Sequence, residues 1–93
     1  MTQPLKDQYP EIHAFVRGYL HEDVVEEYGS PAQAAKNYRA GAGQHRLQQM
    51  KSEWARFLAI NTDVKTANAA LQHLGSAWQF SSMDEIRGMA SEF

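Results

Sequence analysis

Apolar residues recur at helical spacing along most of the chain. Between Pro10 and Leu20 the intervals between large apolar side chains are one, three and four residues, which places them on one face of an amphipathic helix. The same reasoning predicts further helices at 24–28, 31–40, 44–60, 63–74 and from 83 onward. A helical protein is therefore the first expectation.

Residues that favour helix ends stand between these segments. Ser30 and Ser82 are expected to cap the helices that follow them, because a serine oxygen accepts a backbone N–H of the first turn. Asp23 is expected to cap the short helix 24–28, with Glu26 completing a box-like arrangement. Gly29 is expected to end that helix by adopting a left-handed conformation.

Residues 77–80 alternate between apolar and polar side chains, as a strand does. A lone strand would have nothing to pair with, so we predict an irregular connector whose aromatic side chains enter the core. A chain of 93 residues is the size of one domain. The pattern predicts an all-α fold, a single-domain bundle of about five to six short helices over residues 1–93.

Composition excludes several classes of protein. The chain contains no cysteine, which removes disulfides, thiolate zinc sites and cysteine nucleophiles. Residues 1–10 show no apolar run typical of a signal peptide, and no stretch approaches the ~20 apolar residues of a membrane span. We therefore expect a cytoplasmic protein with no membrane role. A net charge of −2 also lacks the basic bias of nucleic-acid binders.

His21, Glu22 and Asp23 are the residues best placed for metal binding or acid–base catalysis. Adjacent side chains diverge, however, and rarely converge on one ion. The chain also lacks a phosphate-binding glycine loop, a nucleophile elbow and a dinucleotide fingerprint. We expect no enzyme, no cofactor and no metal site, although a small metal-assisted hydrolase that uses His21 remains an alternative. His21 and Asp23 are interpreted as residues that satisfy backbone groups at a helix junction.

Charge is distributed unevenly along the chain. Residues 7–28 carry six acids and one base, whereas residues 29–58 carry one acid and the five bases Lys36, Arg39, Arg46, Lys51 and Arg56. The densest acidic cluster consists of Glu22, Asp23, Glu26 and Glu27. Like charges this close repel one another, and helix capping accounts for only part of the cluster. Flanked by Tyr19 and Tyr28, the cluster suits contact with a basic protein surface.

The run YPEIHAFVRGYLHED at residues 9–23, followed by EYGSP at 27–31, resembles a family of immunity proteins from bacterial contact-dependent growth inhibition and related polymorphic toxin systems. In that family an apolar helix ends in five consecutive positions: Tyr, an apolar residue, His, either Gln or Glu, and Asp. An acidic-aromatic stretch and a Ser-Pro helix start follow. The family pattern has an aromatic residue after the Asp, where this chain has Val24.

The resemblance implies an all-α cytoplasmic protein that binds and neutralises the toxic C-terminal domain of a cognate effector, as a monomer in a 1:1 complex. Many such toxins are nucleases with a basic substrate-binding cleft. An acidic protein can occupy this cleft, or can bind beside it and block access. We expect partner contacts from Glu22, Asp23, Glu26, Glu27 and Tyr28, and structural roles for Tyr19, His21, Asp23 and Ser30. Two alternatives stay open: an interface formed by the bases of 36–56, and a generic helical adaptor with a non-toxin partner.

Overall fold

A computed structural model describes residues 4–93, so the first three residues of the predicted domain lie outside it. The helices of the described chain are α1 (Leu5–Gln8), α2 (Pro10–Tyr19), α3 (Val24–Tyr28), α4 (Pro31–Gly41), α5 (Gln44–Ile60), α6 (Val64–His73) and α7 (Met83–Met89). Residues 4–93 contain no strand, which confirms the predicted all-α class. The pattern of apolar residues missed α1, because this four-residue helix buries no side chain.

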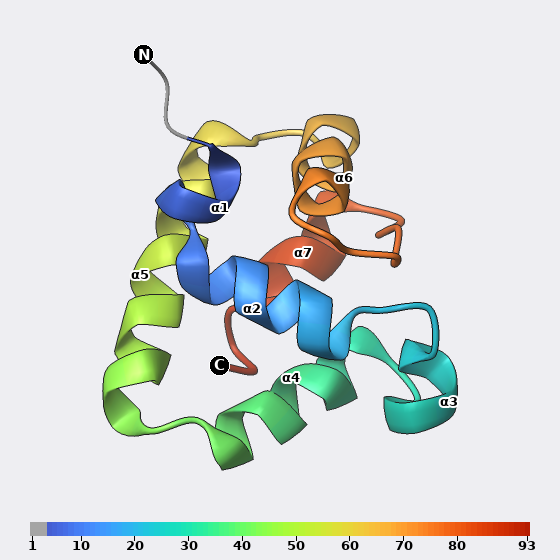
Figure 1. The fold of residues 1–93 in the computed structure, drawn as a ribbon. Coiled ribbons are helices and arrows are strands. Elements are labelled where there is room, and N and C mark those ends of the chain that lie inside the picture. The colour runs from blue at the N-terminus through green and yellow to red at the C-terminus, as the bar shows by residue number, and fades with distance from the viewer. Residues whose placement is uncertain (1–3) are drawn as a thin grey trace.

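Helix α2 crosses the middle of the molecule and organises the other helices around it (Figure 1). It contacts α1, α4 and α5, and α5 stands along one side of the fold while α4 runs below α2. Its apolar face is fully buried through Ile12, Phe15 and Val16. The predicted amphipathic helix 10–20 is therefore the central element of the core.

Aromatic side chains fill the space beneath α2. The ring of Phe93 lies 5.2 Å from Phe15 and 5.3 Å from Trp54, in both cases edge to face. Such pairs stabilise a core by about 0.5–1.5 kcal/mol beyond the area they bury. Phe93 lies beyond the end of α7, so the last residue folds back into the core instead of extending that helix.

The segment between α6 and α7 is irregular, as predicted. The side-chain amide of Asn68 on α6 accepts the Phe80 N–H at 2.9 Å and donates to the Phe80 carbonyl at 2.8 Å. The N–H of Ala77 donates to the carbonyl of Leu20 at the end of α2. These bonds replace the neighbouring strand that the segment lacks. None of the helices within residues 4–93 has the length and apolar character needed to cross a bilayer.

Candidate partner-binding surface

The acidic cluster lies on α3, a short helix at the edge of the molecule, and on the turn that precedes it (Figure 1). Val24 is 3% exposed and holds one side of α3 against the core. Gly29 ends the helix with a φ of 90°, a conformation that glycine adopts without steric cost, and its N–H donates to the Val24 and Val25 carbonyls. As a result, the acidic residues of 22–27 point outward. The position where the family pattern has an aromatic residue is a core position here.

The prediction that the Asp23 side chain caps α3 is wrong. Its backbone has φ −95° and ψ 16°, not the extended conformation of an N-cap, and its carboxylate accepts no hydrogen bond from α3. Instead, the Asp23 N–H donates to His21 Nδ1 at 3.1 Å. Ser30 is extended and its hydroxyl accepts the Gln33 N–H at 3.1 Å, which confirms the predicted cap of α4.

His21 also approaches Glu27, with 3.4 Å between Nε2 and Oε2. Since Nδ1 accepts an N–H, the proton of the neutral ring sits on Nε2. The structure therefore brings His21 together with Glu27 and Asp23, and not with Glu22 as the sequence suggested. Ligand atoms of these three residues lie within 4.8 Å of one another. Exposed acidic groups of this kind are common in proteins without a bound ion, so the cluster by itself does not indicate a metal site.

A row of rings connects this surface to the core. Tyr19 stacks on the buried Phe15 at 5.7 Å and meets Tyr28 at 5.4 Å, and Tyr28 lies 6.5 Å from the ring of His21. Partial burial, together with the charge of Glu27 and a hydrogen bond to it, raises the pKa of Tyr28. The Tyr28 hydroxyl therefore remains neutral at physiological pH. These contacts fix the position of α3 on the fold.

The remaining acidic side chains have no partner within the described chain. Across residues 4–93, the carboxylates of Glu22, Asp23 and Glu26 form neither a hydrogen bond nor an ion pair with another side chain. Val25 lies among them with 56% of its surface exposed. We call the exposed parts of residues 22–28 the α3 surface. The exposure of Val25 was not predicted, because adjacent residues on a helix can both be buried, as Phe15 and Val16 are on α2.

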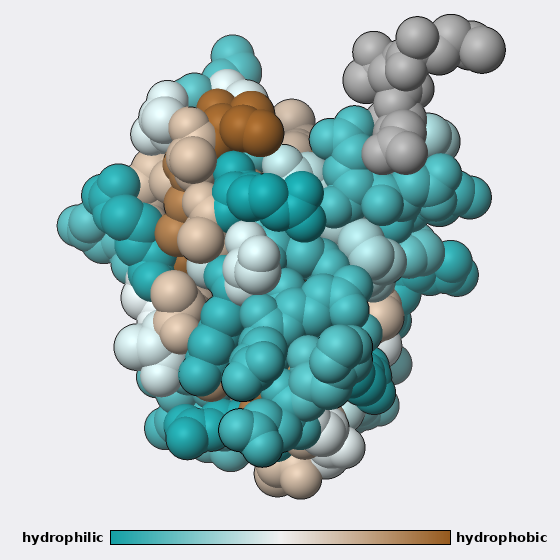
Figure 2. Space-filling view, turned by 90° about the vertical axis from the view of Figure 1, so that its left-hand side faces the viewer, coloured by the Kyte–Doolittle hydropathy of each residue, from teal (hydrophilic) through white to brown (hydrophobic). Residues whose placement is uncertain are grey.

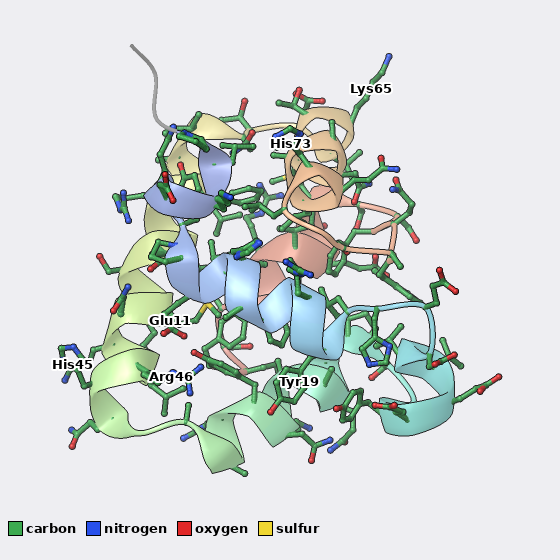
Figure 3. All side chains as sticks on the ribbon, in the orientation of Figure 1. Glu11, Tyr19, His45, Arg46, Lys65 and His73 are labelled. Atoms are coloured by element: carbon green, nitrogen blue, oxygen red, sulfur yellow. The ribbon has the colours of Figure 1, made fainter. Side chains whose placement is uncertain are left out.

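The basic residues of 36–56 are largely used inside the fold. Arg46 on α5 donates to the Glu11 carboxylate of α2 at 3.2 Å, and Figure 3 shows the two side chains pointing toward one another. The Tyr38 hydroxyl of α4 donates to the other oxygen of Glu11 at 2.7 Å. Burial and this bond raise the pKa of Tyr38. The three residues tie α2, α4 and α5 together.

The other four bases of this segment differ in their contacts. Arg56 lies over the ring of Tyr9 at 5.3 Å, and Lys36 is in an exposed ion pair 3.9 Å long. Within the described residues, Arg39 and Lys51 are left without a hydrogen bond or ion pair. The face of the molecule on the side of α5 is mostly hydrophilic, with a hydrophobic patch near its upper edge (Figure 2). Within the described residues, the segment 36–56 therefore has two unpaired bases, whereas the α3 surface has three unpaired carboxylates.

A family model described as CdiI immunity protein matches residues 8–86 of the chain. The matched range extends well beyond residues 9–31, on which the resemblance in the sequence rested, and includes the whole α3 surface. No curated protein and no solved structure matches the chain.

Proposed function

The chain belongs to the CdiI immunity protein family, and we propose that it neutralises a nuclease toxin domain by covering the basic substrate cleft with the α3 surface. The observation that carries this proposal is the set of unpaired carboxylates, Glu22, Asp23 and Glu26, around the exposed Val25. Glu27 and Tyr28 would contribute from the edge of the same surface. The immunity protein would bind as a monomer, in a 1:1 complex.

Physical chemistry favours such a partner. Unpaired like charges on a short helix and the turn before it repel one another, and a basic partner surface would relieve that repulsion. A nuclease cleft binds phosphates through Arg and Lys, which also form strong charge-assisted hydrogen bonds with carboxylates. Opposite charges also steer the two proteins together and exclude wrong partners. An exposed apolar side chain within a polar rim matches the usual anatomy of a protein interface.

The basic segment is the weaker alternative. Arg46 and Arg56 are occupied by contacts with other helices, so a partner that bound them would have to break bonds that hold the fold. Among the described residues, Arg39 and Lys51 could bind a partner without this cost. They provide the matched control for the charge-reversal test.

The test compares two double charge reversals: Glu22→Lys with Glu26→Lys, and Arg39→Glu with Lys51→Glu. The partner used in the test is the toxic domain that the proposal expects to be encoded directly upstream of this gene. Association and dissociation rates are measured across a range of salt concentrations, and each variant is co-expressed with the toxin to measure rescue of growth. We expect the acidic reversal to slow association by about tenfold or more at low salt and to flatten its salt dependence.

The reversal of Arg39 and Lys51 should leave association close to that of the unmodified protein. Circular dichroism confirms that each variant remains helical. If the folded Glu22→Lys, Glu26→Lys variant binds the toxin as the unmodified protein does, the α3 surface is not the interface. Absence of any binding by the unmodified protein to the upstream toxin would overturn the proposed function as a whole.

A further inference from the structure

An apolar pocket of about 170 Å³ lies where the start of α4, the connector between α6 and α7, and α7 itself meet. Its walls include Pro31 and Ala32 from α4, Trp78 and Phe80 from the connector, and Met89 from α7. We call it the Trp78 pocket. An apolar cavity of about 150 Å³ accommodates a benzene ring, so the Trp78 pocket has room for one apolar side chain.

The Trp78 pocket lies next to the α3 surface, because two of the segments that line the pocket are linked to the two ends of that surface. On one side, α4 starts at Pro31, directly after Gly29 ends α3. On the other, Ala77 donates its N–H to the Leu20 carbonyl at 2.8 Å, immediately before His21. A single partner segment could therefore contact the α3 surface and reach the Trp78 pocket.

Trp78 is held less firmly than the other tryptophan. The indole N–H of Trp54 donates to the Ile86 carbonyl at 3.1 Å, whereas the indole Nε1 of Trp78 is covered from solvent and has no acceptor within the described chain. Buried polar groups in proteins nearly always have a partner. Packing alone therefore positions the Trp78 ring.

We propose, on the basis of the proposed function, that the toxin domain inserts one apolar side chain into the Trp78 pocket. Charge indicates which kind of segment supplies it. Glu85 also lines the pocket, and the unpaired carboxylates of Glu22 and Glu26 lie on the neighbouring surface. An apolar side chain within a basic segment of the toxin would satisfy both features. The anchor would slow dissociation, while the charges would speed association.

The test fills the pocket without removing a core contact. Ala32 lines the pocket and is half-buried, so Ala32→Phe places a ring in the space that the toxin would use. Gln33→Phe adds the same ring one residue further along α4, where the side chain is exposed. With the upstream toxin domain as partner, Ala32→Phe should dissociate about tenfold faster or more, while Gln33→Phe should behave as the unmodified protein.

A second measurement does not depend on a substitution. The immunity protein is labelled with 5-fluorotryptophan, and its two fluorine resonances are followed by NMR during titration with unlabelled toxin. The resonance of Trp78 should shift on binding, while that of Trp54, which is 1% exposed, should stay in place. The same spectra show whether Ala32→Phe retains its fold.

The outcomes separate this proposal from the proposed function. Equal dissociation rates for the Ala32→Phe and Gln33→Phe variants, together with an unchanged Trp78 resonance, would overturn the proposal that the pocket binds the toxin. The charge reversals test the role of the α3 surface independently. Faster dissociation of Ala32→Phe with unchanged binding of Glu22→Lys, Glu26→Lys would support the pocket and reject the acidic surface. Failure of the unmodified protein to bind the toxin would overturn both.

Discussion

The carboxylate of Glu53 on α5 accepts a hydrogen bond from the backbone N–H of Ile12 at 3.1 Å, although the two residues are 41 positions apart. The same oxygen accepts the Glu11 N–H at 2.9 Å, and the other oxygen accepts the Gln49 amide at 2.9 Å. Tyr9, at the N-cap position of α2, provides no side-chain cap. Glu53 therefore caps α2 from another helix and fixes the helix that leads to the α3 surface.

Glu53→Gln should lower the free energy of unfolding by about 1–3 kcal/mol. The amide retains one acceptor oxygen for the backbone N–H groups of α2, but the negative charge that strengthens these bonds is lost, and the Gln49 amide has to turn its oxygen toward the new NH₂ group. Urea unfolding followed by circular dichroism measures the change. The matched control is Glu26→Gln, an exposed and unpaired position that should change stability by less than about 0.5 kcal/mol. Equal midpoints for the two variants would contradict the capping role of Glu53.

The role of Glu53 was not visible in the sequence, and the reason is physical. It falls on the apolar face of α5 between Met50 and Phe57, but a pattern of apolar residues assigns any single charge to solvent. Its burial depends on N–H groups of α2 that lack a local cap, and those come from a distant part of the chain. Ser30 and Ser82 could be identified because the capping hydroxyl and the backbone N–H that donates to it lie only three residues apart in the sequence.

The sequence also predicted part of the α3 surface, namely its exposed charges, but not the contacts within it. The charges of Glu22 and Glu26 are exposed, as a dense acidic cluster must be, because burial of unpaired carboxylates is too costly. Which side chain pairs with His21 was not predictable, since it depends on how the turn between α2 and α3 orients the ring. That turn also explains why Asp23 is not a cap: it holds the Asp23 backbone at φ −95° and ψ 16°, and not in the extended conformation that a cap requires.

Asn68→Asp should destabilise the connector between α6 and α7. The Asn68 amide both accepts from and donates to the backbone of Phe80, whereas a carboxylate can only accept. The buried Phe80 carbonyl would then face a negative charge, at an expected cost of about 1–3 kcal/mol. Urea unfolding measures this cost, with the exposed Asn37→Asp as the control. An unfolding midpoint equal to that of the control would show that packing of Phe80 alone holds the connector.

Asp63 should make stability depend on pH in the acid range. Hydrogen bonds from the hydroxyl and the N–H of Thr66 lower the pKa of Asp63 below its ordinary value of 3.8. A depressed pKa in the folded state stabilises the protein above the unfolded pKa, and that contribution is lost as pH falls through the folded value. Asp63→Ala should therefore be less stable than the unmodified protein at neutral pH, and the difference should shrink below pH 3.8.

Unfolding midpoints measured across this pH range, for the unmodified protein and for Asp63→Ala, check the prediction. Asp7→Ala serves as the control, because Asp7 is exposed and its side chain caps no helix. A stability difference for Asp63→Ala that stays constant down to the most acidic condition would show that the carboxylate charge does not contribute to the cap of α6.

Val25 and Ile60 provide a direct test of where the partner binds. Both are large apolar side chains at the surface, 56% and 69% exposed, but Val25 lies within the acidic cluster and Ile60 lies at the end of α5. Because neither side chain is buried, truncation of either to Ala should change stability by less than about 0.5 kcal/mol. If the toxin covers the α3 surface, Val25→Ala should weaken binding by about tenfold, as loss of a central apolar contact does. Ile60→Ala should leave affinity unchanged, and the opposite ranking would place the interface at the end of α5.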